Sequence, residues 1–308
     1  MATYLITQAT GQQGLWTINY LLEAGAKVHA LVRDPSKAPE ALKRPGVTMF
    51  KGEGANFDDV YSAAKGCVGV YLNTYPAIPG LEVLQSRTIV DASRKAGIKT
   101  IVACTTVSTG RRELWDNDSA KKLNLHEYFT SKSVMEDIVR KGGFEAWTLL
   151  RPAFIHVNYM LPHALYNFPR LATHGELDHL FDDGIRMPQS DASDVGKYAA
   201  AALQDPVKFG GQEIAITGES LTIEEVGDIL SRVSGRKVVA RRINPEDGQY
   251  AQGQKFHLFM NLQGVRPAEP VVAAGKATQA KFGIPFTSLE EALQRDKSSL
   301  LECLPDEA

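Results

Sequence analysis

The sequence predicts an α/β fold in which a doubly wound parallel sheet carries helices on both faces and a smaller lobe follows it. Two observations carry this prediction. Short apolar runs alternate with amphipathic stretches from the N-terminus to Arg151, and this alternation ends after Arg151. With 308 residues, of which 44% are hydrophobic and 23% are charged, the chain can bury a large core in one domain or two.

Six strands are predicted from short runs that are rich in Val, Ile, Leu and Thr. They are TYLIT at 3–7, KVHALV at 27–32, VTMFK at 47–51, GVYLN at 69–73, KTIVAC at 99–104 and AWTLLR at 146–151. Helical patterns lie between them, and the clearest one ends at Gly97, where a left-handed helix stop is favoured. Its residues at three- and four-residue steps are Leu81, Leu84, Thr88, Ala92 and Ala96.

After Arg151 the chain is rich in aromatic residues, histidine and proline, which is typical of a separate and smaller lobe. Regular structure returns with a helix from about Asp194 and a strand at 212–217. A further helix covers 222–235, where Thr222 and Glu225 have the spacing of a capping box. The stretch 287–304 is predicted to form one amphipathic helix.

Composition restricts the class of partner. The formal net charge is −2 and no segment concentrates Lys and Arg, so we expect no binding to nucleic acid or to an anionic membrane. Cys67, Cys104 and Cys303 are widely spaced, which favours neither disulfides nor a zinc site and suits a reducing compartment. With no signal peptide or bilayer-spanning stretch recognised, a small-molecule partner and a cytoplasmic location are expected.

The loop TQATGQQG joins the first predicted strand to the first helix, at the edge where parallel sheets bind ligands. Thr7 ends the strand, and Gly11 and Gly14 would allow close approach of a pyrophosphate to backbone amides. Gln8 stands where a first glycine is favoured, and a side chain in a left-handed turn costs about 1 to 2 kcal/mol. The alternative is an ordinary turn between a strand and a helix.

Arg33 directly follows the second predicted strand, where folds that bind NAD place an acidic residue. A guanidinium at this position suits the 2′-phosphate of NADP, and Lys37 would add a second positive charge. The alternative is a surface Arg33 paired with Asp34.

The segments LITQATGQQG, ALVRDPSKA, TLLRPAFIHVN, SDVGKYAAAAL and GESLTIEEVGDILSRVSGR, taken in order, resemble the NmrA-like family of atypical short-chain dehydrogenases/reductases. The resemblance covers nearly the whole chain. It implies a Rossmann-type NADP-binding domain over 1–155 and a substrate lobe over 156–308, with about 194–217 returning to the first domain. It also implies that members are either reductases or proteins that bind the dinucleotide without turnover and act as redox sensors or regulatory partners.

The resemblance places the backbone after Arg151 beside the nicotinamide, and it places Glu53 near the adenine, where an Asp is usual. The cofactor is therefore expected to be NADP(H). The residues expected to hold it are Thr7, Gly11, Gln12, Gln13, Gly14, Arg33, Lys37, Glu53, Asn73, Lys132, Pro152 and Phe154.

Tyr128 and Lys132 fall on the helical face of Met135 and Val139 and match the Tyr-x-x-x-Lys signature of short-chain reductases. In that signature the lysine holds the nicotinamide ribose and lowers the tyrosine pKa from about 10, so that the phenol exchanges a proton with a carbonyl or imine. A chance Tyr with a snorkelling Lys is the alternative. Thr105, Thr106 or Ser108 would supply an assisting hydroxyl, and Thr105 is preferred.

Aromatic and polar residues after the sixth strand predict a mostly apolar cavity for a neutral, ring-containing substrate. A core that joins two lobes is the alternative reading. Trp115, in a long loop over 109–124, is added to this set. The candidate substrate residues are Trp115, Phe154, His156, Asn158, Tyr159 and Tyr166, and no metal ligands are expected.

These observations together predict an NADPH-dependent reductase of a carbonyl, enone or imine in a hydrophobic small molecule, with secondary metabolism as a candidate setting. Two other functions stay open. One is an NADP(H)-binding, redox-sensing regulator that contacts a protein partner. The other is a non-redox enzyme that retains NADP(H) to shape its pocket.

Overall fold

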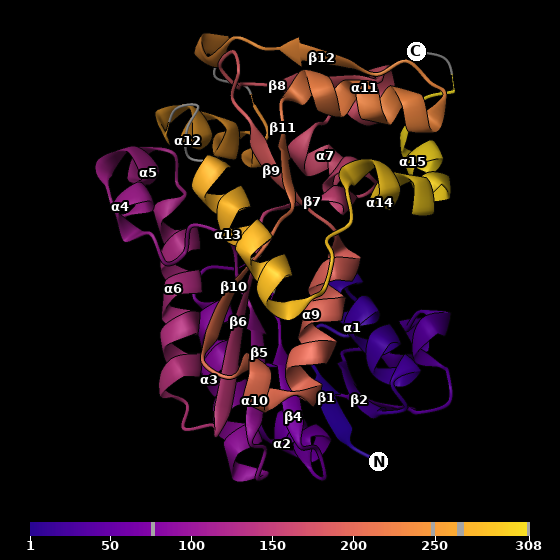
Figure 1. Ribbon diagram of the computed structural model, residues 1–308, viewed down its shortest axis with the longest axis vertical. Coiled ribbons are helices and arrows are strands. Elements are labelled where there is room, and N and C mark those ends of the chain that lie inside the picture. Colours follow the sequence, from indigo (N-terminus) through magenta and orange to yellow (C-terminus); the bar gives the residue numbers. More distant parts are fainter. Residues whose placement is uncertain (75–77, 248–249, 264–267, 307–308) are drawn as a thin grey trace. The chain divides into compact units, whose positions relative to one another are not determined.

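The computed structural model describes residues 1–74, 78–247, 250–263 and 268–306 (Figure 1). The chain forms two compact units. Unit 1 contains Met1–Gly110, Glu127–Pro152 and Ala192–Ile214, and unit 2 contains Arg111–His126, Ala153–Asp191 and Ala215–Ala308. Among the helices within the described ranges, none combines the length and the apolar composition that crossing a membrane requires.

Unit 1 is built on a seven-stranded sheet in the order β10-β6-β5-β4-β1-β2-β3. The pairs from β3 across to β6 are all parallel, which confirms the predicted parallel sheet. Each of the six predicted strands is present within a residue or two of its expected bounds. The strands are β1 Thr3–Ile6, β2 Lys27–Val32, β3 Val47–Lys51, β4 Gly69–Leu72, β5 Thr100–Cys104, β6 Ala146–Pro152 and β10 Gln212–Ile216.

Helices cover both faces of this sheet. Leu5, Val70 and Ile101 share one core with side chains of α2, α3 and α6, and α1 packs along α9, which also contacts β4, β5 and β6. The contact between α1 and α9 is close, because a Cβ on Gly196 would lie 2.5 Å from Cβ of Trp16. The helices of unit 1 are α1 Gln12–Glu23, α2 Phe57–Ala64, α3 Leu81–Lys95, α6 His126–Lys141, α9 Ala192–Gln204 and α10 Pro206–Phe209, with the 3-10 turns η1 Pro35–Lys37 and η2 Glu40–Leu42.

Unit 2 has a core of its own, in which Tyr159, Phe168, Leu230 and Leu293 are buried. Its strands are β7 Phe154–Ile155, β8 Glu176–His179, β9 Met187–Ser190, β11 Glu219–Leu221 and β12 Val239–Arg242. Its helices are α4 Arg112–Trp115, α5 Asp118–Lys122, α7 Ala164–Asn167, α8 Leu171–His174, α11 Ile223–Ser234, α12 Lys255–Gln263, α13 Ala268–Phe282, α14 Leu289–Arg295 and α15 Lys297–Cys303, and its 3-10 turns are η3 His156–Tyr159, η4 Pro245–Asp247 and η5 Gln252–Gln254. The predicted capping box of Thr222 and Glu225 opens α11, as expected.

Three expectations about the fold need correction. The stretch 287–304 forms two helices, because the chain breaks at Asp296 between α14 and α15. Residues 109–124, expected as an irregular loop of the first domain, contain α4 and α5, and from Arg111 onward they belong to unit 2. Helix α3 is present, but Leu84 of its predicted stripe is 51% exposed, whereas Glu82 is buried.

Candidate functional site

The strand order reverses between β1 and β4, and ligands of open α/β sheets bind outside the strand ends at such a point. Thr7 follows β1 there and ties the two strands together. Its hydroxyl lies 3.0 Å from the carbonyl oxygens of Tyr71 and Asn73 and accepts a hydrogen bond from the Asn73 amide at 3.0 Å. Thr7 and Asn73 therefore shape the edge mainly through these mutual contacts.

The loop after Thr7 has the geometry that the sequence indicated. Gln8 has a φ of 49°, in the left-handed region, although it carries a side chain. A Cβ on Gly14 would lie 2.4 Å from the Gln8 carbonyl oxygen, so only glycine fits there. Helix α1 begins at Gln12, slightly earlier than expected, and Gly11 precedes it without a side-chain cap or an acidic residue in the first turn.

This helix start offers backbone N–H groups to an anion, since no side chain of the described residues caps them. Gln13, in the first turn, is held in place by hydrogen bonds of its side chain. Its side-chain oxygen accepts hydrogen bonds from the Tyr71 hydroxyl at 3.2 Å and from the side-chain amide of Asn73 at 3.3 Å. Gln13 thus connects α1 to the end of β4.

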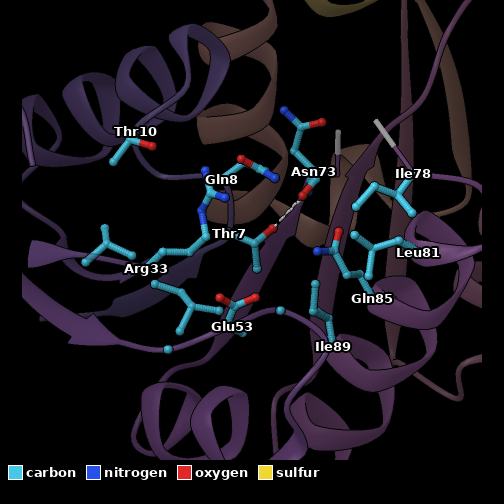
Figure 2. A pocket seen from close by; sticks show the side chains of 14 residues that line it. Thr7, Gln8, Thr10, Arg33, Glu53, Asn73, Ile78, Leu81, Gln85 and Ile89 are labelled. Atoms are coloured by element: carbon cyan, nitrogen blue, oxygen red, sulfur yellow. Dashed lines mark hydrogen bonds between the residues drawn. The ribbon is translucent and has the colours of Figure 1, made fainter. Parts of the chain in front are cut away.

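A pocket of about 240 Å³ opens beside this loop (Figure 2). Figure 2 shows Thr10, Gln8 and Arg33 on one side of it and Ile78, Leu81 and Ile89 on the other. Its lining comes from the ends of β1, β2, β3 and β4 and from α3. The lining residues are Thr7, Gln8, Thr10, Leu31, Val32, Arg33, Gly52, Glu53, Gly54, Asn73, Ile78, Leu81, Gln85 and Ile89.

Arg33 lines this pocket, whereas the carboxylate of its neighbour Asp34 forms hydrogen bonds with Ser36. The Asp34 carboxylate accepts hydrogen bonds from the amide of Ser36 at 3.0 Å and from its hydroxyl at 2.6 Å, and Lys37 lies 3.8 Å away. In the part of the chain that the structure describes, the alternative pair of Arg33 with Asp34 is therefore not formed. Lys37 is 85% exposed at its side chain and is not among the lining residues.

The pocket fits the adenosine end of a dinucleotide. A planar base suits the apolar side formed by Ile78, Leu81 and Ile89, and the guanidinium of Arg33 suits a phosphate on the ribose. Gly14 packs against the carbonyl oxygen of Gln8, and because it has no side chain, a pyrophosphate can approach the backbone closely. Glu53 also lines the pocket and brings a negative charge to its wall.

A second cluster of the same unit contains the predicted pair of Tyr128 and Lys132. Lys132 is buried, and its ammonium lies 2.5 Å from the carboxylate of Glu82 on α3 and 5.9 Å from the centre of the Tyr128 ring. The Glu82 carboxylate also accepts hydrogen bonds at 2.5 Å from the hydroxyls of Thr74 and Ser131. Lys132 is thus held in place by a buried ion pair, and the alternative of a snorkelling lysine is wrong.

The pKa of Tyr128 moves in the opposite direction from the expected one. Burial raises it above its usual value, and this outweighs the lowering by the Lys132 charge and by a hydrogen bond with the Thr106 side chain. Glu82 and Cys104 raise it further. Tyr128 is therefore a protonated phenol at neutral pH, which suits a proton donor.

Thr106, rather than the preferred Thr105, meets Tyr128. The Thr105 hydroxyl instead donates to Glu136 at 2.8 Å. The same carboxylate pairs with Arg151, whose Nε lies 2.8 Å from it. Consecutive side chains of an extended segment point to opposite sides, so only one of the two threonines can face the phenol.

At the end of β6, Pro152 is buried and holds the segment after β5. Its carbonyl oxygen accepts hydrogen bonds from the Val107 amide at 3.0 Å and from the Thr106 hydroxyl at 3.4 Å. Arg151 reaches the same segment, since a Cβ on Gly110 would lie 2.9 Å from its guanidinium. The contacts of Pro152 therefore fix the position of Thr106.

All six expected substrate residues belong to unit 2. Tyr159 is fully buried between the rings of Phe154 and Phe168, and its hydroxyl contacts Gln189 at 3.2 Å. His156 is buried between the carboxylates of Asp191 and Asp296. Both residues make their contacts within unit 2, and these contacts do not correspond to a core that joins two lobes.

The remaining candidates differ in exposure. Trp115 is buried and packs near the ring of His126, whereas Tyr166 is 51% exposed. Asn158 and Phe154 are partly buried. Within the described ranges, the structure gathers no group of three or more His, Cys, Asp and Glu side chains with the geometry of a metal site.

Sequence reasoning missed Glu82 and did not single out Thr106. Glu82 was hidden because an acidic residue in a helical pattern is normally assigned to the solvent face. Its signal would have been Lys132, since a buried lysine needs a buried acidic partner.

The strand order and the ligand-binding edge define a Rossmann-type α/β protein. A model of the NmrA-like family matches residues 2–253, and the chain belongs to that family. The chain is 26% identical over 286 residues to the NmrA-like family domain-containing oxidoreductase malD of Malbranchea aurantiaca, which covers 82% of this chain and 80% of that protein.

Two other similar proteins represent different activities. The nitrogen metabolite repression protein nmrA of Emericella nidulans is 28% identical over 271 residues, which are 84% of this chain and 70% of that protein. Among solved structures, the NADPH-dependent quinone oxidoreductase QOR2 of Escherichia coli, complexed with NADPH, matches with a TM-score of 0.72 and 22% identity over 96% of this chain and 99% of that chain. At this identity the match concerns the fold.

Replacing Lys132 with Met removes the partner of a carboxylate that is 2% exposed. We expect the free energy of unfolding near neutral pH to fall by about 3 to 5 kcal/mol, because Glu82 stays charged and buried without compensation. In the wild type, Lys132 holds the pKa of Glu82 below its usual value against the opposing effect of burial. The pair therefore contributes stability above about pH 4, and this contribution is lost as the pH falls through the lowered pKa.

Urea denaturation at about pH 7 and about pH 5 measures this effect. In the Lys132→Met variant the unpaired Glu82 has a raised pKa and takes up a proton on acidification, so the deficit relative to the wild type shrinks at the lower pH. The double variant Lys132→Met/Glu82→Gln is the control and recovers part of the stability. A deficit below about 1 kcal/mol at neutral pH would show that the pair is not a major support.

Proposed function

We propose that this protein is an NADPH-dependent reductase that acts on a carbonyl, enone or imine of a neutral, ring-containing small molecule. The observation that carries the proposal is the presence, in one unit, of a nucleotide-sized pocket lined by Arg33 and of a partly buried Tyr128 beside a buried Lys132 at the carboxyl edge of the same sheet. Asn73 lines the pocket, and the next residue, Thr74, donates to the Glu82 that holds Lys132.

The cofactor would be held by the backbone from Gln8 to Gly14, with Arg33 at the ribose phosphate and Glu53 near the base. When bound, NADPH supplies the hydride for the carbon atom of the substrate. Tyr128 donates its phenolic proton to the oxygen or nitrogen atom that gains the electron pair, and Thr106 orients the phenol. The Lys132 ammonium then stabilises the phenolate until it is protonated from solvent, which closes the proton balance.

Aromatic packing and a low density of charge in unit 2 support a neutral substrate. Phe154 is partly buried against the rings of Tyr159 and Phe168, and the segment that follows Pro152 carries few charges. A phosphorylated or polycarboxylate substrate needs paired Arg or Lys to replace its water. The free and buried thiols of Cys67, Cys104 and Cys303 support a reducing, cytoplasmic setting.

A second function is supported by the similarity to the nitrogen metabolite repression protein. In this case the chain binds NADP(H) and signals its redox state to a protein partner without turnover. The two functions differ in whether NADPH is consumed.

Replacing Arg33 with Ala tests the cofactor. We expect NADPH affinity to fall about 10- to 100-fold, because a charge-assisted hydrogen bond to the 2′-phosphate is lost, while NADH affinity changes little. Titration calorimetry with both reduced cofactors measures this. Lys37→Ala is the matched control, since it removes an exposed cation of the same segment that does not line the pocket.

Equal affinity of the wild type for NADPH and NADH, or an Arg33→Ala variant that binds NADPH normally, would contradict the assignment of Arg33. A Lys37→Ala variant with the larger loss would move the phosphate site to that residue.

Replacing Tyr128 with Phe tests the reductase. With quinones, enones and cyclic imines as a panel, we expect kcat to fall about 100-fold or more with a small change in KM, because the proton donor is lost and the ring remains. Tyr61→Phe on α2 is the control and keeps wild-type turnover. Full activity of Tyr128→Phe would exclude it as the donor, and NADPH binding without oxidation across the panel would favour the regulator.

A further inference from the structure

Helix α3 presents two different faces to the site. Leu81, Gln85 and Ile89 recur every four residues and line the nucleotide pocket. Glu82 lies next to Leu81 in sequence but is buried and contacts Lys132, Ser131 and Thr74. One helix therefore supplies a wall of the pocket and a charge beside the proton donor.

Side chains from α6, α3 and the β5 segment act on Tyr128. Lys132 comes from its own helix α6, Glu82 from α3 and Cys104 from β5, while Thr106 follows β5 and is uncharged. Cys104 is a neutral thiol, because burial raises its pKa to about 12. Tyr71, which contacts Cys104, is also neutral because burial raises its pKa. Of these groups in the described part of the chain, Lys132 and Glu82 are the ones that carry a charge at neutral pH.

These two charges have opposite effects on the phenol. The positive charge of Lys132 stabilises a phenolate, and the carboxylate 2.5 Å from that ammonium cancels part of its field. A lysine without such a partner would draw Tyr128 toward the ionised form, which is a proton acceptor and serves oxidation of an alcohol. With Glu82 in place, the phenol keeps its proton.

We propose that Glu82 is a positioning residue that fixes Lys132 and offsets its charge, so that Tyr128 keeps the proton that it donates during reduction. This inference rests on the proposed reductase function and adds to it a residue that keeps the proton on the donor. Burial of the pair is what gives Glu82 this influence, since solvent screens its charge poorly there.

The test is the ionisation of Tyr128 itself, followed by NMR of the ring carbon that bears the hydroxyl in tyrosine-labelled protein. The Tyr128→Phe variant assigns the signal. In the wild type we expect Tyr128 to stay protonated up to about pH 10. In Glu82→Gln the midpoint falls by about one pH unit, because the Tyr128 phenolate replaces Glu82 as the anion that keeps the buried Lys132 charged.

Two further variants make the test specific. Glu82→Asp keeps the charge on a shorter side chain, so its midpoint lies between those of the wild type and Glu82→Gln, and it decides the question if Glu82→Gln does not fold. Glu127→Gln is the matched control, since it removes an exposed acidic side chain next to Tyr128 in sequence and leaves the midpoint unchanged. A midpoint in Glu82→Gln or Glu82→Asp that equals or exceeds the wild-type value would overturn the proposal.

The titration needs no substrate, so it is independent of the reductase assignment. If the midpoints shift as expected and no compound of the panel is reduced, the proposed function fails while the role of Glu82 in holding the proton on Tyr128 stands. If the panel contains a substrate, the loss of reduction at alkaline pH begins about one pH unit lower in Glu82→Gln than in the wild type.

Discussion

The ion pair between Glu82 and Lys132 is the interaction on which the site depends most. Two charges that are nearly excluded from water lose their hydration, which costs free energy. A short distance between the charges and further hydrogen bonds to the charged groups offset this cost. The pair is short, and Thr74 and Ser131 add two further hydrogen bonds to the carboxylate. It connects α3, α6 and the end of β4, and so holds the helix of Tyr128 and one wall of the pocket in fixed positions.

A second constraint acts at the loop after β1. The Gln8 carbonyl oxygen accepts a hydrogen bond from the Gly11 amide at 3.0 Å and lies so close to Gly14 that a side chain there is excluded. Gln8 takes a left-handed conformation despite its side chain, at a cost of about 1 to 2 kcal/mol. The turn is therefore held by its surroundings even where the sequence departs from glycine.

The strands of unit 1 were predictable because a strand buried in a parallel sheet is apolar on both faces and reads as a continuous run. The position of Tyr128 and Lys132 on one face of a helix was predictable from their spacing in the sequence. Glu82 was not, since its burial depends on a lysine 50 residues away. The choice of Thr106 over Thr105 depends on which side of the chain faces α6, and a strand pattern that is apolar on both sides does not indicate this.

The break at Asp296 was hidden for a related reason. Residues 287–304 keep a helical period, but Asp296 contacts the buried His156, which is 140 residues away in the chain. Long-range polar contacts of this kind leave no trace in local periodicity. The bounds of the two units likewise follow from packing, since 111–126 has the composition of an exposed loop and yet buries Trp115.

A crystal structure of the protein with NADPH bound would place the cofactor against each of the residues proposed to contact it. We expect that the ribose phosphate contacts Arg33, that the nicotinamide ribose lies within hydrogen-bond distance of Lys132, and that the Tyr128 hydroxyl faces the nicotinamide ring. A cofactor that lies outside the pocket of Arg33, or whose nicotinamide points away from Tyr128, would contradict this expectation.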